Sequence, residues 1–330
     1  MTAGWLARLA LCMALVAPAL AAEVPTELTL VSEHAVEGMD AGHLSGMAWC
    51  GDAFWAVSDR DDTGLYRLDS GESIWRAEAE RFELPPPPDT GLSWGTRMRS
   101  LITGLVRGGK MDFEGLSCDR LGNRYLVSEA YAAVLRVNPA GTAEWLKLPD
   151  SLIRQARASG MLLRFNAMFE GITVDPEASR LWLAAEHSRR GLLVMHHNQS
   201  SWQCTGGCVL IAEGGREAPP PAMGEGEQPL RFSGLAFHNG KLYTLEPVPH
   251  QICRRRLDTG AVERCWSYAQ TALADTRRYD TPFGNAEALG IDEESAWIGI
   301  DNNQLTRADG EQRPIVWRLA APKGGWGAKQ

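Results

Sequence analysis

A short strand-opening phrase occurs five times along the chain, at intervals of roughly 55–70 residues. In each copy an acid or a serine leads an apolar segment, a turn follows, and a second apolar segment ends in another acid or close to one. The copies begin at Leu44, Phe113, Phe169, Phe232 and Ala286. Such a repeat limits the fold strongly, because one unit cannot bury its apolar face alone and must stack against its neighbours.

Further apolar segments follow each pair. A third segment occurs at residues 65–68, 134–137, 192–195 and 252–254, and a fourth at residues 144–148 and 209–212. Four short antiparallel strands per repeat are typical of a β-propeller blade. We therefore predict an all-β fold, a single β-propeller domain over residues 23–330 with five readable blades, or six if one is degenerate. The last repeat lacks a fourth strand, and we expect residues 28–31 to supply it and close the ring. The insert at residues 150–164 predicts a helix capped by Asp150.

The N-terminus predicts export. Arg8 precedes an apolar run, and Ala19-Leu20-Ala21 supplies the small residues of a cleavage site, so residues 1–22 are expected to be a signal peptide. We therefore expect a periplasmic or secreted protein. The apolar run is too short to span a bilayer, and a membrane span is not expected. The net charge of −8 disfavours nucleic acid and anionic membranes as partners, because both require a positive surface. A monomer is the favoured state.

Export also decides how the cysteines are interpreted. Without Cys12 in the signal peptide, six of the seven cysteines remain, an even number in an oxidising compartment. A zinc site would need paired C-x₂-C spacing, which is absent from the sequence. We predict three structural disulfides with the favoured pairing Cys50 with Cys118, Cys204 with Cys208, and Cys253 with Cys265.

The strand directions bring the acids to one face. The residue that begins each first strand and the acid that ends the antiparallel second strand lie at the same end of the blade, near the axis. Two rings are therefore expected. The inner ring consists of Ser45, Glu114, Glu170, Ser233 and Glu287, and the outer ring of Asp59, Glu129, Glu186, Glu246 and Asp301.

Eight carboxylates around one mouth raise each other's pKa values unless a cation is present. Oxygen-rich sites suit hard cations, and Ca²⁺ tolerates loose geometry better than Mg²⁺ does. The predicted metal ligands are thus Asp59, Glu114, Glu129, Glu170, Glu186, Glu246, Glu287 and Asp301. For any single acid, capping a strand end or pairing with an arginine of the next blade is an equal alternative.

Basic and polar residues follow the outer ring in the chain. Arg60, His187, His250 and Asn302 lie in the loops after the second strands, on the same expected face. A group of acids with basic residues in the loops around it suits the binding of a phosphate or carboxylate ester through a bridging metal ion. These four residues are the predicted substrate-binding residues. No catalytic residue can be assigned from the sequence.

Several of these phrases resemble one exported bacterial family. Asp112-Phe113-Glu114-Gly115-Leu116, Phe169-Glu170-Gly171-Ile172 and Asn285-Ala286-Glu287-Ala288-Leu289 are similar to strand starts of the family described as "esterase-like activity of phytase". Leu44-Ser45-Gly46-Met47 resembles its first repeat. The resemblance covers about residues 40–305 and implies a propeller with Ca²⁺-assisted phosphoester or ester cleavage. The chain departs from the family's pattern at Ala288, where glycine is usual, and at Ser233, where an acid is usual.

Three functions remain open at this point. The first is hydrolysis of a small-molecule phosphate or carboxylate ester by a metal-activated water. The second is a non-catalytic propeller that binds an envelope ligand or protein through the same face. The third is a lactonase-like propeller with a similar arrangement of Ca²⁺ and carboxylates. A fold by itself does not choose among them.

Overall fold

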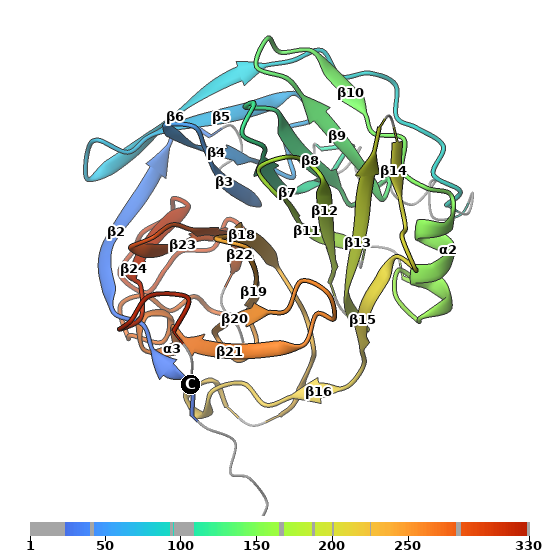
Figure 1. The fold of residues 1–330 in the computed structure, drawn as a ribbon. Coiled ribbons are helices and arrows are strands. Elements are labelled where there is room, and N and C mark those ends of the chain that lie inside the picture. Colours follow the sequence, from blue (N-terminus) through green and yellow to red (C-terminus); the bar gives the residue numbers. More distant parts are fainter. Residues whose placement is uncertain are drawn as a thin grey trace, which may run out of the picture.

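The computed structural model describes residues 24–39, 43–92, 95, 109–164, 168–186, 189–199, 201–224, 226–281 and 285–328. Each sequence repeat forms an antiparallel unit (Figure 1). The first unit contains β3 (Gly46–Cys50), β4 (Ala53–Val57), β5 (Gly64–Asp69) and β6 (Ile74–Arg81). The second contains β7 (Phe113–Cys118), β8 (Arg124–Ser128), β9 (Ala133–Val137) and β10 (Ala143–Trp145).

The later repeats follow the same plan. The third unit contains β11 (Phe169–Val174), β12 (Arg180–Ala185), β13 (Arg190–Asn198), β14 (Ser201–Gln203) and β15 (Val209–Glu213). The fourth contains β18 (Gly234–His238), β19 (Lys241–Glu246), β20 (Gln251–Arg255) and β21 (Val262–Ser267), and the fifth contains β22 (Ala286–Ile291), β23 (Ser295–Ile300) and β24 (Ile315–Ala320). The connecting segments hold β16 (Arg216–Glu217), β17 (Gln228–Pro229), the 3₁₀ turn η2 (Pro221–Met223) and α3 (Ala269–Ala272).

The first strands of the units lie around a common axis. β3 contacts β7, β7 contacts β11, β11 contacts β18, β18 contacts β22, and β22 contacts β3. Figure 1 shows these strands near the centre and the later strands of each unit farther out. This arrangement agrees with the all-β propeller expected from the repeats.

The N-terminal strand joins the two ends of the ring. β2 (Leu30–Glu37) pairs antiparallel with β24, as expected for the missing fourth strand, and β1 (Thr26–Glu27) pairs with β21. β2 begins two residues later than the predicted residues 28–31. It also extends beyond them to Glu37, because the polar residues Ser32, Glu33 and His34 continue the pairing with β24. It also pairs with β6 in parallel, so the first and last units merge into one eight-stranded sheet. The number of blades therefore stays a prediction.

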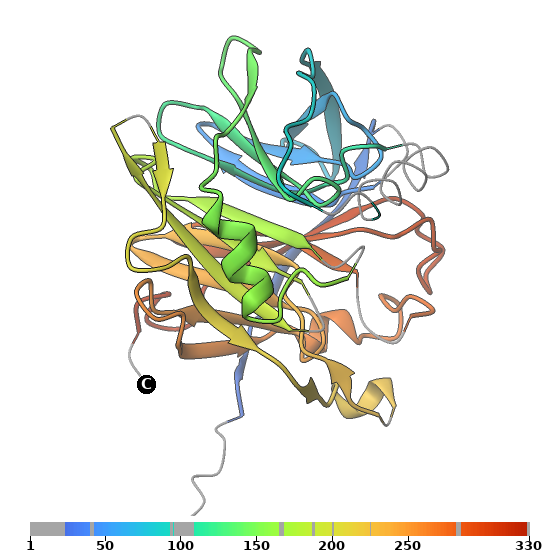
Figure 2. The same cartoon turned by 90° about the vertical axis from the view of Figure 1, so that its right-hand side faces the viewer.

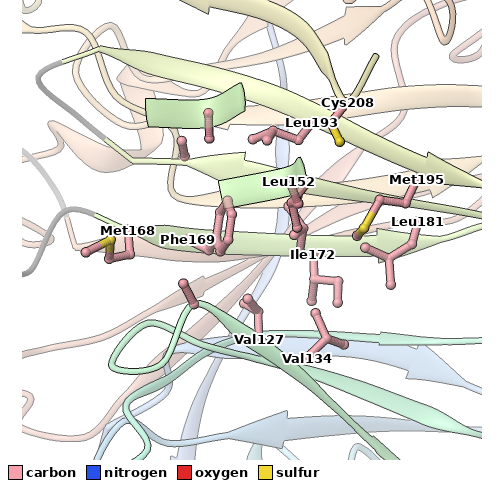
Figure 3. Close-up of a cluster of buried hydrophobic side chains, with 14 of the residues drawn as sticks. Val127, Val134, Leu152, Met168, Phe169, Ile172, Leu181, Leu193, Met195 and Cys208 are labelled. Atoms are coloured by element: carbon pink, nitrogen blue, oxygen red, sulfur yellow. The ribbon is translucent and has the colours of Figure 1, made fainter. Parts of the chain in front are cut away.

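Helix α2 (Ser151–Ala158) is shorter than the predicted helix. Asp150 lies at the N-cap position, as predicted, but makes no side-chain capping hydrogen bond. The helix ends before Gly160, which has a φ of 86° and cannot continue it. Leu152 of α2, which Figure 2 shows beside the third unit, packs with Phe169, Ile172 and Val134 in one buried cluster that joins the second and third units (Figure 3).

The six cysteines form the three expected disulfides, namely Cys50–Cys118, Cys204–Cys208 and Cys253–Cys265. Cys50 and Cys118 are the last residues of β3 and β7 and thus join adjacent units. Cys253 and Cys265 face each other across β20 and β21. Within the described residues, no helix is long and apolar enough to cross a bilayer.

Candidate functional site

Each inner-ring glutamate sits at an irregularity of its first strand. The ladder shifts register between Phe113 and Gly115 in β7, between Phe169 and Gly171 in β11, and between Ala286 and Ala288 in β22. The skipped residue is the glutamate in every case. A β-bulge of this kind redirects one side chain while the strand continues, and bulges are frequent next to active sites.

The other two inner-ring positions are regular. Ser45 and Ser233 precede β3 and β18, and their backbone N–H groups donate to the carbonyl oxygens of Val57 and Leu245 at 3.1 Å each. The β3–β4 and β18–β19 ladders show no register shift. Between the first and second strands of the described repeats, the bulge thus occurs only where the inner-ring residue is a glutamate.

The inner-ring glutamates surround a very small space on the axis. Glu114, Glu170 and Glu287 line a cavity of about 10 Å³, together with backbone of Gly46, Gly115 and other strand-start residues. That volume is about the minimum that holds one water molecule. The axis is therefore closed to a substrate and large enough for a single small species.

The outer-ring acids lie beside this space and form clusters with the inner ring. Three groups have potential ligand atoms that all lie within 4.8 Å of one another. These groups are Glu129 with Glu170 and Glu186, Asp59 with Asp112 and Glu114, and His43 with Asp59 and Asp301. Seven of the eight predicted ligands thus belong to one continuous acidic centre, if Glu287 on the axial cavity is included.

The crowding changes the protonation of these carboxyls. Loss of solvent, reinforced by Asp112 and Glu186, holds the pKa of Glu129 well above its usual range. Glu114 and Glu170 show the same direction for the same reasons, namely desolvation and neighbouring carboxylates. Burial raises the pKa of Glu287 to about 8, although Arg231 opposes this shift. The centre therefore carries more negative groups than its surroundings neutralise.

Glu246 lies at the matching place in its repeat but has different neighbours. Its carboxylate accepts hydrogen bonds from Arg190 and Arg255, each at 2.8 Å, and from the hydroxyl of Thr244 at 2.9 Å. Although burial opposes them, the two arginines hold the pKa of Glu246 below its ordinary value. The structure places Glu246 in an ion-pair network and not in the acidic centre.

The predicted substrate-binding residues are dispersed. Arg60 pairs with Asp59 at 2.9 Å, beside the acidic centre. Asn302 is buried, and its amide donates to the carbonyl oxygens of Leu305 and Gln312, which holds its own loop. His250 is buried at the edge of a neighbouring cavity. His187 lies outside the described residues.

Three residues of the centre were not among the predicted metal ligands or substrate-binding residues. His43 Nδ1 lies 3.1 Å from Asp301 and 3.7 Å from Asp59, and the hydrogen bond to Asp301 raises the pKa of His43. Asp112 precedes the first bulge, and Arg231 pairs with Glu186. The sequence could have identified His43 and Asp112 as candidates, because each lies two residues before an inner-ring position, Ser45 or Glu114.

Known proteins support this architecture. Residues 40–200, slightly less than half of the chain, match the family model described as Phytase-like, esterase-like activity of phytase. The resemblance inferred from the sequence is confirmed over these residues. No curated protein matches the chain.

Several solved structures are similar in fold. Glutaminyl cyclase of Myxococcus xanthus is 11% identical, with a TM-score of 0.50, over 91% of this chain and 100% of that chain. The PQQ-bound aldose sugar dehydrogenase of Streptomyces coelicolor is 11% identical, with a TM-score of 0.43, over 90% and 99%. A chain of a nidogen/laminin complex is 12% identical, with a TM-score of 0.43, over 81% and 77%. At such identities the likeness concerns the fold alone.

Proposed function

We propose that this chain, whose residues 40–200 match the phytase-like family, is an exported hydrolase that cleaves a phosphate or carboxylate ester at its acidic axial face with the help of a divalent cation. The observation that carries the proposal is the acidic centre itself. Its carboxylates come from four repeats, and three of them, those of Glu114, Glu170 and Glu287, line a space of about 10 Å³. Three disulfides agree with an oxidising compartment and hence with export.

The donor set fits a hard cation. The centre offers carboxylate oxygens, and burial, reinforced by repulsion between neighbouring carboxylates, raises the pKa values of Glu114, Glu129 and Glu170. A divalent cation would remove that repulsion, and Ca²⁺ accepts 6–8 oxygen ligands in irregular geometry. Two groups of acids could hold such a cation, namely Glu129 with Glu170 and Glu186, and Asp59 with Asp112 and Glu114.

The cations of the chain would orient the substrate. Arg231 pairs with Glu186, and Arg60 pairs with Asp59, so both guanidinium groups lie at the rim of the acidic centre. A guanidinium group binds phosphate or carboxylate oxygens with directed hydrogen bonds. These arginines would bind the anionic part of an ester and place its reacting atom above the acids. The bound cation would supply charge neutralisation and Lewis acidity.

Calorimetry tests the cation site. Ca²⁺ is titrated into chelator-treated wild type, Glu170→Gln and the control Glu72→Gln, whose side chain is exposed in a turn. We expect Glu170→Gln to weaken Ca²⁺ binding at least about tenfold, which corresponds to about 1.4 kcal/mol, because a charged ligand is lost. Glu72→Gln should bind as the wild type does. Equal affinities in all three proteins would remove Glu170 from the site.

Turnover separates an enzyme from a binding protein. Generic phosphomonoesters and acyl esters, with a lactone included, are offered to the protein with and without chelator. We expect chelator-sensitive hydrolysis of at least one class. Binding of Ca²⁺ without metal-dependent turnover across the panel would contradict the hydrolase proposal and favour a non-catalytic propeller.

A further inference from the structure

A second cavity lies beside the acidic centre, between the fourth and fifth units. Its volume is about 230 Å³, and His250, Tyr268 and Asn285 are buried in its wall. The apolar part of the wall includes Ile300 and Trp317. A cavity of about 150 Å³ accommodates one benzene ring, and drug-sized ligands need about 300 Å³ or more. This cavity therefore has the size for a single small ring or a short chain.

The wall contains an unusual concentration of polar atoms without partners. Within the described part of the chain, His250 Nε2, the hydroxyls of Tyr268 and Tyr279, and Asn285 Nδ2 are buried and make no hydrogen bond. All four residues line this one cavity. Buried polar groups are normally hydrogen-bonded, because leaving them unpaired is unfavourable. Four such groups around one space indicate that a bound ligand supplies their missing hydrogen bonds.

The four groups are uncharged at neutral pH. Burial lowers the pKa of His250 to about 4 and raises those of Tyr268 and Tyr279 above their usual range. His250 Nδ1 lies 3.1 Å from the carbonyl oxygen of Val248, so Nδ1 carries the proton and Nε2 is an acceptor. The tyrosine hydroxyls and the Asn285 amide can donate. These four groups thus offer donors and an acceptor but no charge.

Two arginines, Arg277 and Arg278, also line the cavity, and both have partners of their own. Arg277 Nε donates to Glu33 at 2.7 Å, and Arg278 Nε donates to the carbonyl oxygen of Leu273 at 2.8 Å. Arg277 is partly exposed and Arg278 is exposed, so the buried part of the wall has no cationic side chain among the described residues that line it. An anionic group placed beside His250, Tyr268 and Asn285 would lose its hydration, and the charge of Arg277 is already shared with Glu33. The buried part of the cavity is suited to a neutral group.

The cavity borders the acidic centre. The carboxylates of Glu287 and Glu246, after burial itself, contribute to the raised pKa of Tyr268, so its phenol lies near both. Ala286 lines the cavity and directly precedes Glu287 in the bulge of β22. The backbone carbonyl of Asn285 accepts a hydrogen bond from the N–H of Asp301 at 2.8 Å. A ligand that fills the cavity could thus extend to the carboxylates.

We propose that this cavity binds an uncharged, hydroxylated organic group, such as a sugar ring or a short polyol. A hydroxyl group both donates and accepts, which matches the mixture of donors and one acceptor in the wall. The apolar surface of Ile300 and Trp317 would contact the carbon skeleton. That this group is the alcohol part of the ester rests on the proposed function, whereas the binding itself does not.

The test compares two tyrosine variants. Tyr268→Phe removes a hydroxyl that has no hydrogen-bond partner among the described residues, and Tyr125→Phe removes one that donates to Asp119 at 2.9 Å. Binding of glucose and glycerol, with glucose 6-phosphate as the charged counterpart, is measured by ligand-observed NMR on chelator-treated protein. Thermal unfolding is measured on the same samples.

We expect the wild type to bind at least one uncharged probe saturably and in preference to glucose 6-phosphate. Tyr268→Phe should weaken that binding about five- to tenfold and leave the Tm unchanged, because one ligand hydrogen bond is lost. Tyr125→Phe should show the reverse, a lower Tm with unchanged binding.

Three results would overturn the proposal. The first is that neither uncharged probe binds saturably, which would assign the cavity to water. The second is equal binding of the probe by wild type and Tyr268→Phe. The third is a fall in Tm for Tyr268→Phe as large as that for Tyr125→Phe. Because the assay uses neither Ca²⁺ nor turnover, its failure is distinct from failure of the hydrolase proposal. Sugar binding without hydrolysis would retain the cavity and contradict the function, and hydrolysis without sugar binding would do the opposite.

Discussion

Glu129 and Glu246 show how neighbours decide the role of a carboxylate. Glu246 is the last residue of the second strand of its repeat, Glu129 directly follows the second strand of its own, and both are buried. Glu129 faces Asp112 and Glu186, and its pKa is raised, whereas Glu246 faces Arg190 and Arg255, and its pKa is lowered. Removing one partner of a buried ion pair is destabilising, but removing one of several like charges relieves repulsion. Equivalent positions in a repeat thus belong to a cluster of acids in one unit and to an ion-pair network in another.

The acidic centre predicts a pH-dependent stability for the chelated protein. The pKa of Glu287 rises from an ordinary 4.5 to about 8 in the folded state, so the folded protein binds this proton more tightly. Its contribution is complete below pH 4.5 and is lost as the pH rises toward 8. We expect the free energy of unfolding of wild type to fall relative to that of Glu287→Gln by up to about 1.4 kcal/mol per pH unit in this window.

The measurement is urea unfolding of both proteins at several pH values between 5 and 8 in the presence of chelator. The difference between the two proteins is used because histidines also titrate there. The raised pKa of His43 acts in the same direction, and the lowered pKa values of His238 and His250 act in the opposite one. A difference that stays constant over the window would show that Glu287 has an ordinary pKa.

The strand is the element that turns the repeat into a site. β7, β11 and β22 each shift register at their glutamate, whereas β3 and β18, which follow serines, pair regularly. The insertion of one residue redirects a charged side chain toward the axis without breaking the hydrogen-bonded ladder. The disulfide at the other end of β3 and β7 then holds two adjacent units together.

The three disulfides should contribute unequally to stability. Cys50–Cys118 has a sequence separation of 68 and Cys204–Cys208 one of 4, and a longer loop loses more entropy on cross-linking. We expect Cys50→Ala with Cys118→Ala to lower the free energy of unfolding by about 4 kcal/mol, and the control Cys204→Ala with Cys208→Ala by about 2 kcal/mol. Denaturant unfolding of both double variants measures this. Equal losses would mean that local packing, not loop closure, dominates.

The whole ring depends on close contact between its first strands. A Cβ added at Gly46 of β3 would lie 2.8 Å from the Cα of Gly115 in β7, closer than such atoms approach. The narrow axis is a consequence, because backbone meets backbone where larger side chains would separate the units. This contact also keeps the inner-ring glutamates close together around a cavity of about 10 Å³.

Gly46→Ala therefore tests the closed axis. We expect a loss of about 1–3 kcal/mol in the free energy of unfolding, because the overpacked strands must separate. Gly71→Ala is the matched control, since its Cβ would meet only the Asp69 carboxylate at 3.4 Å, and it should be neutral within about 0.5 kcal/mol. Thermal and urea unfolding report both changes. A Gly46→Ala protein as stable as the control would contradict tight axial packing.

The sequence by itself determined the repeat, the order of the strands within it, the cysteine pairs and the gathering of acids on one face. All of these follow from local patterns or from positions that recur at fixed places in a strand. Only the tertiary structure decided which acids share a centre. Glu246 pairs with Arg190 and Arg255 outside the centre. His43 and Asp112 lie within the centre, and Arg231 pairs with one of its acids. The cavity of His250, Tyr268 and Asn285 likewise joins segments that no pattern links. Charge pairing and cavity shape depend on contacts between segments that are distant in the sequence. The sequence of one repeat does not specify which residues of the other repeats lie beside it.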